Sequence, residues 1–92
     1  MDKEQKEIEF SNHFWNRFER RKNDVIELTI ELIKDTVLNP DFTVEDIKPN
    51  REGRIKKING RCLKVIVEVE KDKLKIITVF WDRTLRRKGL CK

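Results

Sequence analysis

The chain has 92 residues, which suits one small domain with a modest core and leaves no room for a second core. Charged residues make up 42% of it and hydrophobic residues 37%, a balance typical of proteins from thermophiles. The formal net charge of +5 favours a polyanionic partner, and the lack of a long apolar run argues against a membrane partner. With no signal-like start, we expect a cytoplasmic protein.

The chain opens with an expected short strand over 7–10 and a helix from Ser11 to about Lys22. Ser11 suits the N-cap position, because its hydroxyl can accept a hydrogen bond from an unpaired amide of the first turn. A second helix is expected from about Asp24; it is apolar around most of its circumference and should be the central packing element. The turn at 39–41 stops it, because proline cannot continue a helix.

The first helix carries the only histidine of the chain, His13, in its first turn. There the positive end of the helix dipole favours the neutral imidazole and attracts phosphate oxygens. At about 100° per residue, His13, Arg17 and Arg20 lie close together on a strip that faces the solvent. This strip is a candidate catalytic surface, and the alternative is a surface histidine on an ordinary amphipathic helix.

After the second helix the apolar period changes from helical to extended, and 44–48 is expected to be an edge strand. The segment 54–58, the pair Asn59-Gly60 and the chain from residue 61 onward predict a β-hairpin. Asn-Gly supplies both positive φ values of a type I′ turn. These strands and the next one are expected to form an antiparallel sheet.

Strands over 62–70 and 74–81 are expected to pair across a turn at 71–73. A three-residue loop pairs Glu70 with Leu74, and a slip of one residue would invert every face. The resulting cross-strand pairs give one apolar face for the helices: Val67 with Ile77, Val65 with Val79, and Leu63 with Trp81. The opposite face carries Lys64, Ile66, Glu68, Ile76, Thr78 and Phe80.

Thr78 is the odd residue of that opposite face. It supplies a hydroxyl among apolar side chains, and the same pairing puts it near Lys64. A functional role and the ordinary preference of threonine for strands explain it about equally well, so Thr78 is a candidate site residue.

The chain has two cysteines, Cys62 in a predicted strand and Cys91 near its end. They have no motif spacing and are too few for a disulfide framework or a zinc site, so we expect two reduced thiols. The acidic residues are scattered singly over helices and turns, which gives magnesium no carboxylate cluster. The sequence therefore predicts neither a metal site nor a cofactor.

Basic residues gather in two segments of the chain. Residues 48–64 hold seven Lys or Arg against one acid, and residues 82–92 hold five against one. The segment 83–92 is expected to be a mobile basic tail that becomes ordered against an acidic partner, either an antitoxin segment or RNA.

Short motifs follow one another along the chain: Ser11-Asn12-His13 at a helix start, Arg17 four residues after the histidine, the turn Asn39-Pro40-Asp41, the strand from Gly60 to Val67, and Ile77-Thr78-Val79-Phe80. In this order and spacing they resemble the RelE/ParE toxin superfamily, part of a ribonuclease fold shared with barnase, EndoU and colicin-type RNases. Within it, they are most similar to one uncharacterised RelE-like family. The resemblance implies a single α+β domain over 1–92, with two N-terminal helices packed on one face of a small antiparallel sheet and a short basic tail over 83–92.

Carried over residue by residue, the resemblance implies a catalytic site of His13, Arg17 and Thr78. The candidate nucleic-acid-binding residues are the basic neighbours on the helix, the strands and the tail: Arg20, Arg61, Lys64, Arg83, Arg86 and Arg87. The chain departs from RelE-type toxins because it has no tyrosine, whereas those toxins often place one near a basic C-terminal cluster. This argues against ribosome-dependent cleavage and leaves a ribonuclease that acts on free RNA, or a ParE-like protein that binds a target.

The implied function is that of a toxin in a toxin–antitoxin system, with RNA and an acidic antitoxin protein as partners. RNA suits the site better than DNA, because cleavage without a metal uses the 2′-hydroxyl as an internal nucleophile. His13 would act as general base, Arg17 would stabilise charge on the phosphate together with Arg61 or Lys64, and Thr78 would bond a nonbridging oxygen. The alternatives are a non-catalytic nucleic-acid- or protein-binding module and a toxin-like fold that inhibits a protein target.

Overall fold

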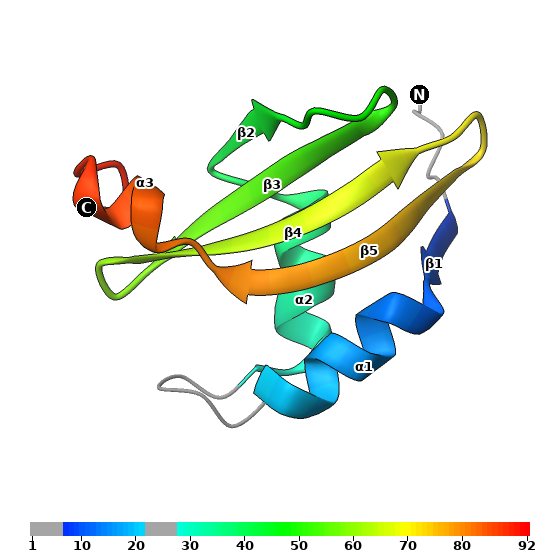
Figure 1. Ribbon diagram of the computed structural model, residues 1–92, viewed down its shortest axis with the longest axis horizontal. Coiled ribbons are helices and arrows are strands. Elements are labelled where there is room, and N and C mark those ends of the chain that lie inside the picture. Colours follow the sequence, from blue (N-terminus) through cyan, green and yellow to red (C-terminus); the bar gives the residue numbers. More distant parts are fainter. Residues whose placement is uncertain (1–6, 22–27) are drawn as a thin grey trace.

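The computed structural model describes residues 7–21 and 28–92, in which a mixed sheet is accompanied by short helices (Figure 1). The elements in chain order are β1 (Glu7–Phe10), α1 (Asn12–Arg21), α2 (Ile30–Leu38), β2 (Phe42–Glu45), β3 (Arg51–Ile58), β4 (Arg61–Val69), β5 (Lys73–Trp81) and α3 (Arg83–Arg87). The strand order is β1-β5-β4-β3-β2, so β1 and β2 are the edges of the sheet. The fold class is α+β, as the sequence predicts. None of the helices in the described ranges is long and apolar enough to cross a membrane.

β1 forms at the predicted residues but pairs in parallel with β5, so the expectation of a wholly antiparallel sheet is wrong at this edge. Glu9 Oε1 lies 2.7 Å from Lys73 Nζ, across the two strands. The hydrogen bond from Lys73, together with its positive charge, holds the pKa of Glu9 below its usual value. Phe10 lies opposite Ile76, and α1 begins soon after it. The parallel pairing therefore places the start of α1 beside the middle of β5.

β3 and β4 form the predicted hairpin. Ile58 pairs with Arg61 across Asn59 and Gly60, whose φ angles are 52° and 80°. These left-handed values are the ones that a type I′ turn needs, so the Asn-Gly prediction is confirmed.

β2 is the other edge strand, as predicted, but it covers Phe42–Glu45 instead of 44–48. Asp41 sets this earlier start, because it is bonded twice to β3. Its N–H donates to Ile55 O, and its Oδ2 accepts the N–H of Lys57, both at 2.7 Å. These two hydrogen bonds start the pairing of β2 with β3 at residues 41–42, whereas the apolar alternation predicted a strand from residue 44.

β4 and β5 pair antiparallel, with a shift in register between Ile66 and Val67. On one side of the shift the predicted pairs are confirmed: Leu63 with Trp81, and Val65 with Val79. On the other side the predicted partners are wrong by one residue: Val67 pairs with Ile76 instead of Ile77, and Leu74 pairs with Val69 instead of Glu70. The irregularity leaves Ile77 as an extra residue of β5, which is the pattern of a β-bulge.

The bulge moves Ile76 from the predicted opposite face into the core. Ile76 is fully buried, whereas the extra residue Ile77 is half-buried. Thr78 keeps its predicted face, because it pairs with Ile66 on the side of the shift where the register is as expected. One inserted residue therefore changes the core and leaves the candidate site residue in place.

Within residues 7–21 and 28–92, the buried side chains form two groups. The larger group joins α1 and α2 to the sheet: Phe14, Phe18, Leu28, Ile33, Val37, Leu63, Val65, Val67, Leu74, Ile76 and Val79. We call the side of the sheet that bears Leu63, Val65 and Val67 the core face, and the other side the far face. Cys62 precedes Leu63 in β4 and therefore points to the far face. There the smaller group collects: Ile55, Cys62 and Cys91, with Phe42, Val44 and Leu85 packed around them.

α2 begins later than the expected Asp24. Residues 22–27 lie outside the described ranges, but Leu28 and Thr29 are described and are not helical. Thr29 is the N-cap, because its extended backbone lets its hydroxyl accept the N–H of Leu32 at 3.0 Å. The end of the helix before the turn at 39–41 is confirmed.

Two cations of β3 bind the C-terminal end of α2. Arg54 Nη1 donates to Val37 O at 2.7 Å, and Lys56 Nζ donates to Asn39 O at 3.1 Å. Carbonyls at the end of a helix lack partners within the helix, so these bonds satisfy groups that would otherwise be open. Part of the basic run at 48–64 therefore holds the fold together.

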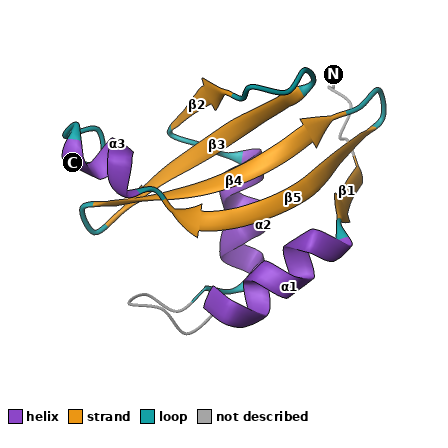
Figure 2. Ribbon diagram, in the orientation of Figure 1, coloured by secondary structure: helices purple, strands orange, loops and turns teal. Residues whose placement is uncertain are grey.

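The segment 83–92 is folded onto the far face, so the expectation of a mobile tail is wrong (Figure 2). Arg83–Arg87 forms α3, and Asp82 is its N-cap, with Oδ1 accepting the N–H of Leu85 at 3.0 Å. Gly89, whose φ is 77°, then follows the helix in the left-handed conformation that commonly ends one. The turn brings the next residues back to the sheet.

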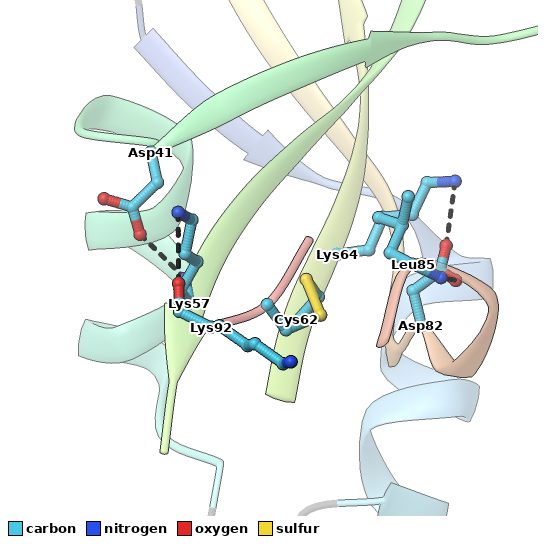
Figure 3. Close-up of a disulfide and its surroundings, with 8 residues drawn as sticks. Asp41, Lys57, Cys62, Lys64, Asp82, Leu85 and Lys92 are labelled. Carbon is cyan, nitrogen blue, oxygen red and sulfur yellow. Dashed lines mark hydrogen bonds and ion pairs between the residues drawn. A yellow bond between two sulfur atoms is a disulfide. The ribbon is translucent and has the colours of Figure 1, made fainter. Parts of the chain in front are cut away.

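A disulfide joins Cys62 of β4 to Cys91, so the expectation of two reduced thiols is wrong (Figure 3). The two Cα atoms are 5.2 Å apart, and both cysteines are buried beside Ile55. Their pairing depends on the path of the chain through α3. Cysteine count and motif spacing carry no information about that path.

Val67→Asp should unfold the domain, because Val67 is fully buried in the larger core. An unpaired buried carboxylate costs several kcal/mol, out of the about 5–15 kcal/mol that holds a small domain folded. Thermal unfolding followed by circular dichroism measures the effect, with Thr43→Asp at an exposed position of β2 as the matched control. A cooperative transition of Val67→Asp near the wild-type temperature would contradict the assigned register.

Cys91→Ser should lower the free energy of unfolding by about 3 kcal/mol, a typical contribution of a cross-link between distant residues. The disulfide joins positions 29 residues apart. Urea titrations of the oxidised wild type, the variant, and the wild type kept in a dithiol reductant measure it. The last two should agree with each other, and equal midpoints for all three would show that the bond contributes nothing.

Candidate functional site

Ser11 fastens the start of α1 to the middle of β5. Its N–H donates to Ile76 O at 3.0 Å, and its hydroxyl donates to Ile77 O at 3.2 Å. The same hydroxyl oxygen accepts the N–H of Phe14 at 3.0 Å, which confirms Ser11 as the N-cap. One side chain therefore begins the helix and fixes its first turn against the strand that carries Thr78.

His13 lies in this first turn and is exposed, as predicted. Arg20 is exposed further along α1, whereas Phe14 and Phe18 are buried, so the solvent-facing strip lies apart from the buried side of the helix, as the periodicity predicts. The backbone of Arg17 follows His13 by four residues, which places the two positions on one side of the helix. The side chain of Arg17 lies outside the described part of the chain.

Thr78 lies on the far face, where it pairs with Ile66. Its hydroxyl oxygen is buried and has no hydrogen-bond partner within residues 7–21 and 28–92. A closed hydroxyl of this kind meets a phosphate from solvent only if its neighbours move. Ser11 thus fastens the start of α1 to β5 directly before Thr78, but the imidazole of His13 is exposed whereas the hydroxyl of Thr78 is closed on the far face.

Lys64 has structural partners on the far face. Its Nζ lies 3.3 Å from Asp82 Oδ2 and 5.7 Å from the ring centroid of Phe80. Its aliphatic stem crosses β3 at Gly53, where the Cβ atom of any larger residue would come within 2.7 Å of Lys64 Cε. Lys64 is therefore held by an ion pair, an aromatic face and a glycine, which leaves it less available to phosphate than a free lysine.

Asp82 is a residue that the sequence reasoning missed. Its two carboxylate oxygens do different work: Oδ1 caps α3 through Leu85, and Oδ2 pairs with Lys64. An aspartate directly before a short helix is a known start signal, and that pattern at Asp82-Arg83 could have revealed α3. No local pattern of the sequence indicated the ion pair of Asp82 with Lys64, because the two residues are 18 positions apart.

Arg61 stacks on an aromatic ring. Its guanidinium carbon lies 5.6 Å from the ring centroid of Trp81, within the range of a cation–π contact. Arg61 shares the parity of Leu63 along β4, so it lies toward the core face, whereas Lys64 points to the far face. The structure therefore separates these two cations, which the sequence had grouped as one phosphate site.

The arginines of α3 form the clearest exposed basic surface. Arg83, Arg86 and Arg87 are exposed, and they make no ion pair with any other residue that the structure describes. Helical geometry puts them within about 100° of one another, on the side of α3 opposite to Leu85. Leu85 packs against the smaller core, so the arginines face away from the sheet. We call these three residues the α3 arginines.

Two kinds of side chain described above can take part in chemistry: an imidazole can transfer a proton, and a guanidinium can stabilise negative charge. Histidine is the side chain best suited to exchange a proton near neutral pH, and His13 stands exposed at a helix start. Within the described ranges, no group of three or more His, Cys, Asp or Glu side chains is arranged to hold a metal ion.

A family model matches residues 10–81, and its description is Domain of unknown function (DUF4258). The matched range includes His13, Arg17 and Thr78 and ends at the last residue of β5. Searches of curated proteins and of solved structures find no match.

Thr78→Val should leave the free energy of unfolding unchanged or raise it slightly, by up to about 1 kcal/mol. The reason is that valine keeps the shape of the side chain and removes a buried hydroxyl that has no partner among the described residues. Urea unfolding measures this, with Thr36→Val as the matched control. The hydroxyl of Thr36 is also buried but donates to Leu32 O at 2.9 Å, so this control should be less stable than Thr78→Val.

Proposed function

The chain belongs to the DUF4258 family of domains of unknown function, and we propose that this member is a toxin-like endoribonuclease that cleaves RNA without a metal ion. The proposal includes a RelE-like arrangement, in which the two N-terminal helices pack on one face of the sheet. Its natural partners would be RNA and an acidic antitoxin protein. The sequence motifs, the net charge and the geometry at the start of α1 support it.

The observation that carries the proposal is the attachment of α1 to β5 through Ser11. Its three hydrogen bonds hold the first turn of the helix beside the bulge of β5. His13 is thereby held at an exposed helix start, and the residue that begins this helix is bonded to β5 directly before Thr78. A helix N-terminus attracts phosphate oxygens, so the imidazole would stand where a phosphodiester can approach.

In the proposed reaction, neutral His13 takes the proton of a ribose 2′-hydroxyl. The 2′-oxygen then attacks the adjacent phosphorus, and the 5′-oxygen of the next nucleotide leaves with a proton from water. The products are a 2′,3′-cyclic phosphate and a 5′-hydroxyl. Arg17 and Arg20, on the same helix side, would stabilise the extra negative charge on the phosphate. A positioned general base contributes roughly 100-fold to 10,000-fold to such a reaction.

The α3 arginines would hold the phosphates of the same strand away from the cleavage point. Arg83, Arg86 and Arg87 are exposed and face away from the sheet, and guanidinium groups bind phosphate oxygens in pairs of hydrogen bonds. Exposed cations of this kind supply affinity without sequence preference. The same surface would suit an acidic antitoxin segment.

A second candidate function is a non-catalytic nucleic-acid- or protein-binding module. The closed hydroxyl of Thr78 and the ion pair of Lys64 with Asp82 favour it, because both residues were expected to contact phosphate. In this alternative the α3 arginines carry the binding and His13 is an ordinary surface residue. Binding without cleavage distinguishes the two functions.

His13→Ala should lower RNA cleavage by roughly 100-fold to 10,000-fold, because it removes the general base. The thermal transition should hardly change, since the exposed ring contributes little to packing. The assay uses purified protein, an unstructured RNA and EDTA, with Asn16→Ala at another exposed position of α1 as the matched control. Expression of wild type and variant in cells then compares their effect on growth.

Wild type that neither cuts RNA nor slows growth would contradict the nuclease proposal, as would a His13→Ala variant that equals wild type in both. If such protein still binds RNA, the binding module takes its place. If cleavage is lost in Asn16→Ala as well, the effect belongs to the helix and not to the imidazole.

A further inference from the structure

α3 is held to the domain by few contacts. It has five residues, far fewer than a helix needs to be stable alone in water. Its apolar anchor is Leu85, which packs beside Ile55 and the disulfide, and its start is fixed by the cap from Asp82. The strongest tie is the covalent one, from Cys62 of β4 to Cys91 (Figure 3).

We propose that the Cys62–Cys91 disulfide is a redox latch, which keeps α3 on the far face and thereby sets the affinity of the α3 arginines for single-stranded RNA. This inference rests on the proposed RNA binding and adds its regulation. In the oxidised protein the three guanidinium groups project from one fixed helix side. In the reduced protein α3 detaches and the arginines lose their common geometry.

The latch affects affinity through preorganisation. Leu85 faces the sheet, so docking of α3 forces Arg83, Arg86 and Arg87 to face solvent together. A free segment loses conformational entropy when it binds, whereas a docked helix has already lost that freedom. Reduction therefore weakens phosphate binding without changing the net charge of the arginines.

The opening reaction is thiol–disulfide exchange with a dithiol reductant. Its thiolate attacks one sulfur of the Cys62–Cys91 bond, and a mixed disulfide forms while the other cysteine leaves as a thiolate. The second thiol of the reductant then displaces the first sulfur. The S–S bond of the protein takes up two electrons and two protons to give two thiols, and the reductant is oxidised to its own disulfide.

Because both cysteines are buried, the disulfide is reduced only when α3 moves away from the sheet. Cys62 is 1% exposed and Cys91 is 2% exposed, so a reductant reaches the sulfurs only when the segment around them moves. RNA bound to the arginines of the docked helix would favour the closed state and slow the reduction. Redox state and RNA occupancy are thereby coupled in both directions.

The experiment compares the oxidised wild type, the wild type kept in dithiothreitol, and a Cys62→Ser/Cys91→Ser double variant. Amide hydrogen exchange follows residues 83–92 and, as an internal reference, the amides of β5. Fluorescence anisotropy with a short unstructured RNA gives the affinity over a range of salt concentrations. Arg83→Gln/Arg86→Gln/Arg87→Gln in the oxidised protein shows what is lost when the α3 arginines are removed without opening the latch.

Reduction should leave the α3 amides with almost no protection, whereas the amides of β5 should exchange faster only by the factor of about 150 that a loss of about 3 kcal/mol of global stability explains, and should stay protected. On reduction, RNA affinity should fall by about tenfold with little change in the slope of log K against log salt, because the arginines keep their charge. Removal of the three arginines should instead weaken that slope by about two units, since each lost phosphate contact of a single strand counts for about 0.7. The double variant should match the reduced wild type in both measurements. The triple arginine variant should show the weakened slope with slow exchange of α3.

Three results would overturn the latch: unchanged exchange of α3 after reduction, equal RNA affinity of the two redox states, or loss of protection throughout β5, which would make the bond a staple of the whole domain. Equal affinity with firm binding would leave the proposed RNA function intact. If the oxidised protein binds no RNA although α3 opens on reduction, the proposed RNA function is wrong. The disulfide would then still keep α3 docked, but this would not control RNA binding.

Discussion

The break in the ladder between β4 and β5 is the feature on which the arrangement of this protein depends. Because Ile77 is an extra residue of β5, Ile76 turns into the core while Thr78 remains on the far face. The carbonyls of Ile76 and Ile77 are the acceptors to which Ser11 is bonded. One irregularity therefore connects the packing of the sheet, the start of α1 and the position of His13.

The two faces of the sheet are stabilised by different means. The side chains of the core face belong to the larger apolar cluster, whose burial is the usual source of stability in a small domain. Among the described residues the apolar group of the far face is small, and a disulfide takes the place of a larger core there.

Local signals in the sequence were sufficient for the local features. Asn59-Gly60 identified the hairpin and Ser11 the helix start, because each rests on the conformation or bonding of one or two residues. The bulge was not predictable, since Ile76 and Ile77 are the same residue type and either one fits the core. The parallel edge, the disulfide and the docking of α3 depend on contacts between distant segments, which no short pattern encodes.

The same distinction applies to charge. The basic run at 48–64 predicted a nucleic-acid-binding surface. Most of its cations instead contact other residues of the domain: Arg51 with Glu68, Arg54 and Lys56 with the end of α2, Arg61 with Trp81, and Lys64 with Asp82. A cation that neutralises a carboxylate or a helix end contributes little potential to the outside. The arginines of α3 stay exposed and form no ion pair with any other described residue, because the side of the helix that packs on the sheet is the apolar one, with Leu85. In this chain, which basic side chains are exposed and unpaired among the described residues depends on how the elements pack, and not on how many basic residues lie close together in the sequence.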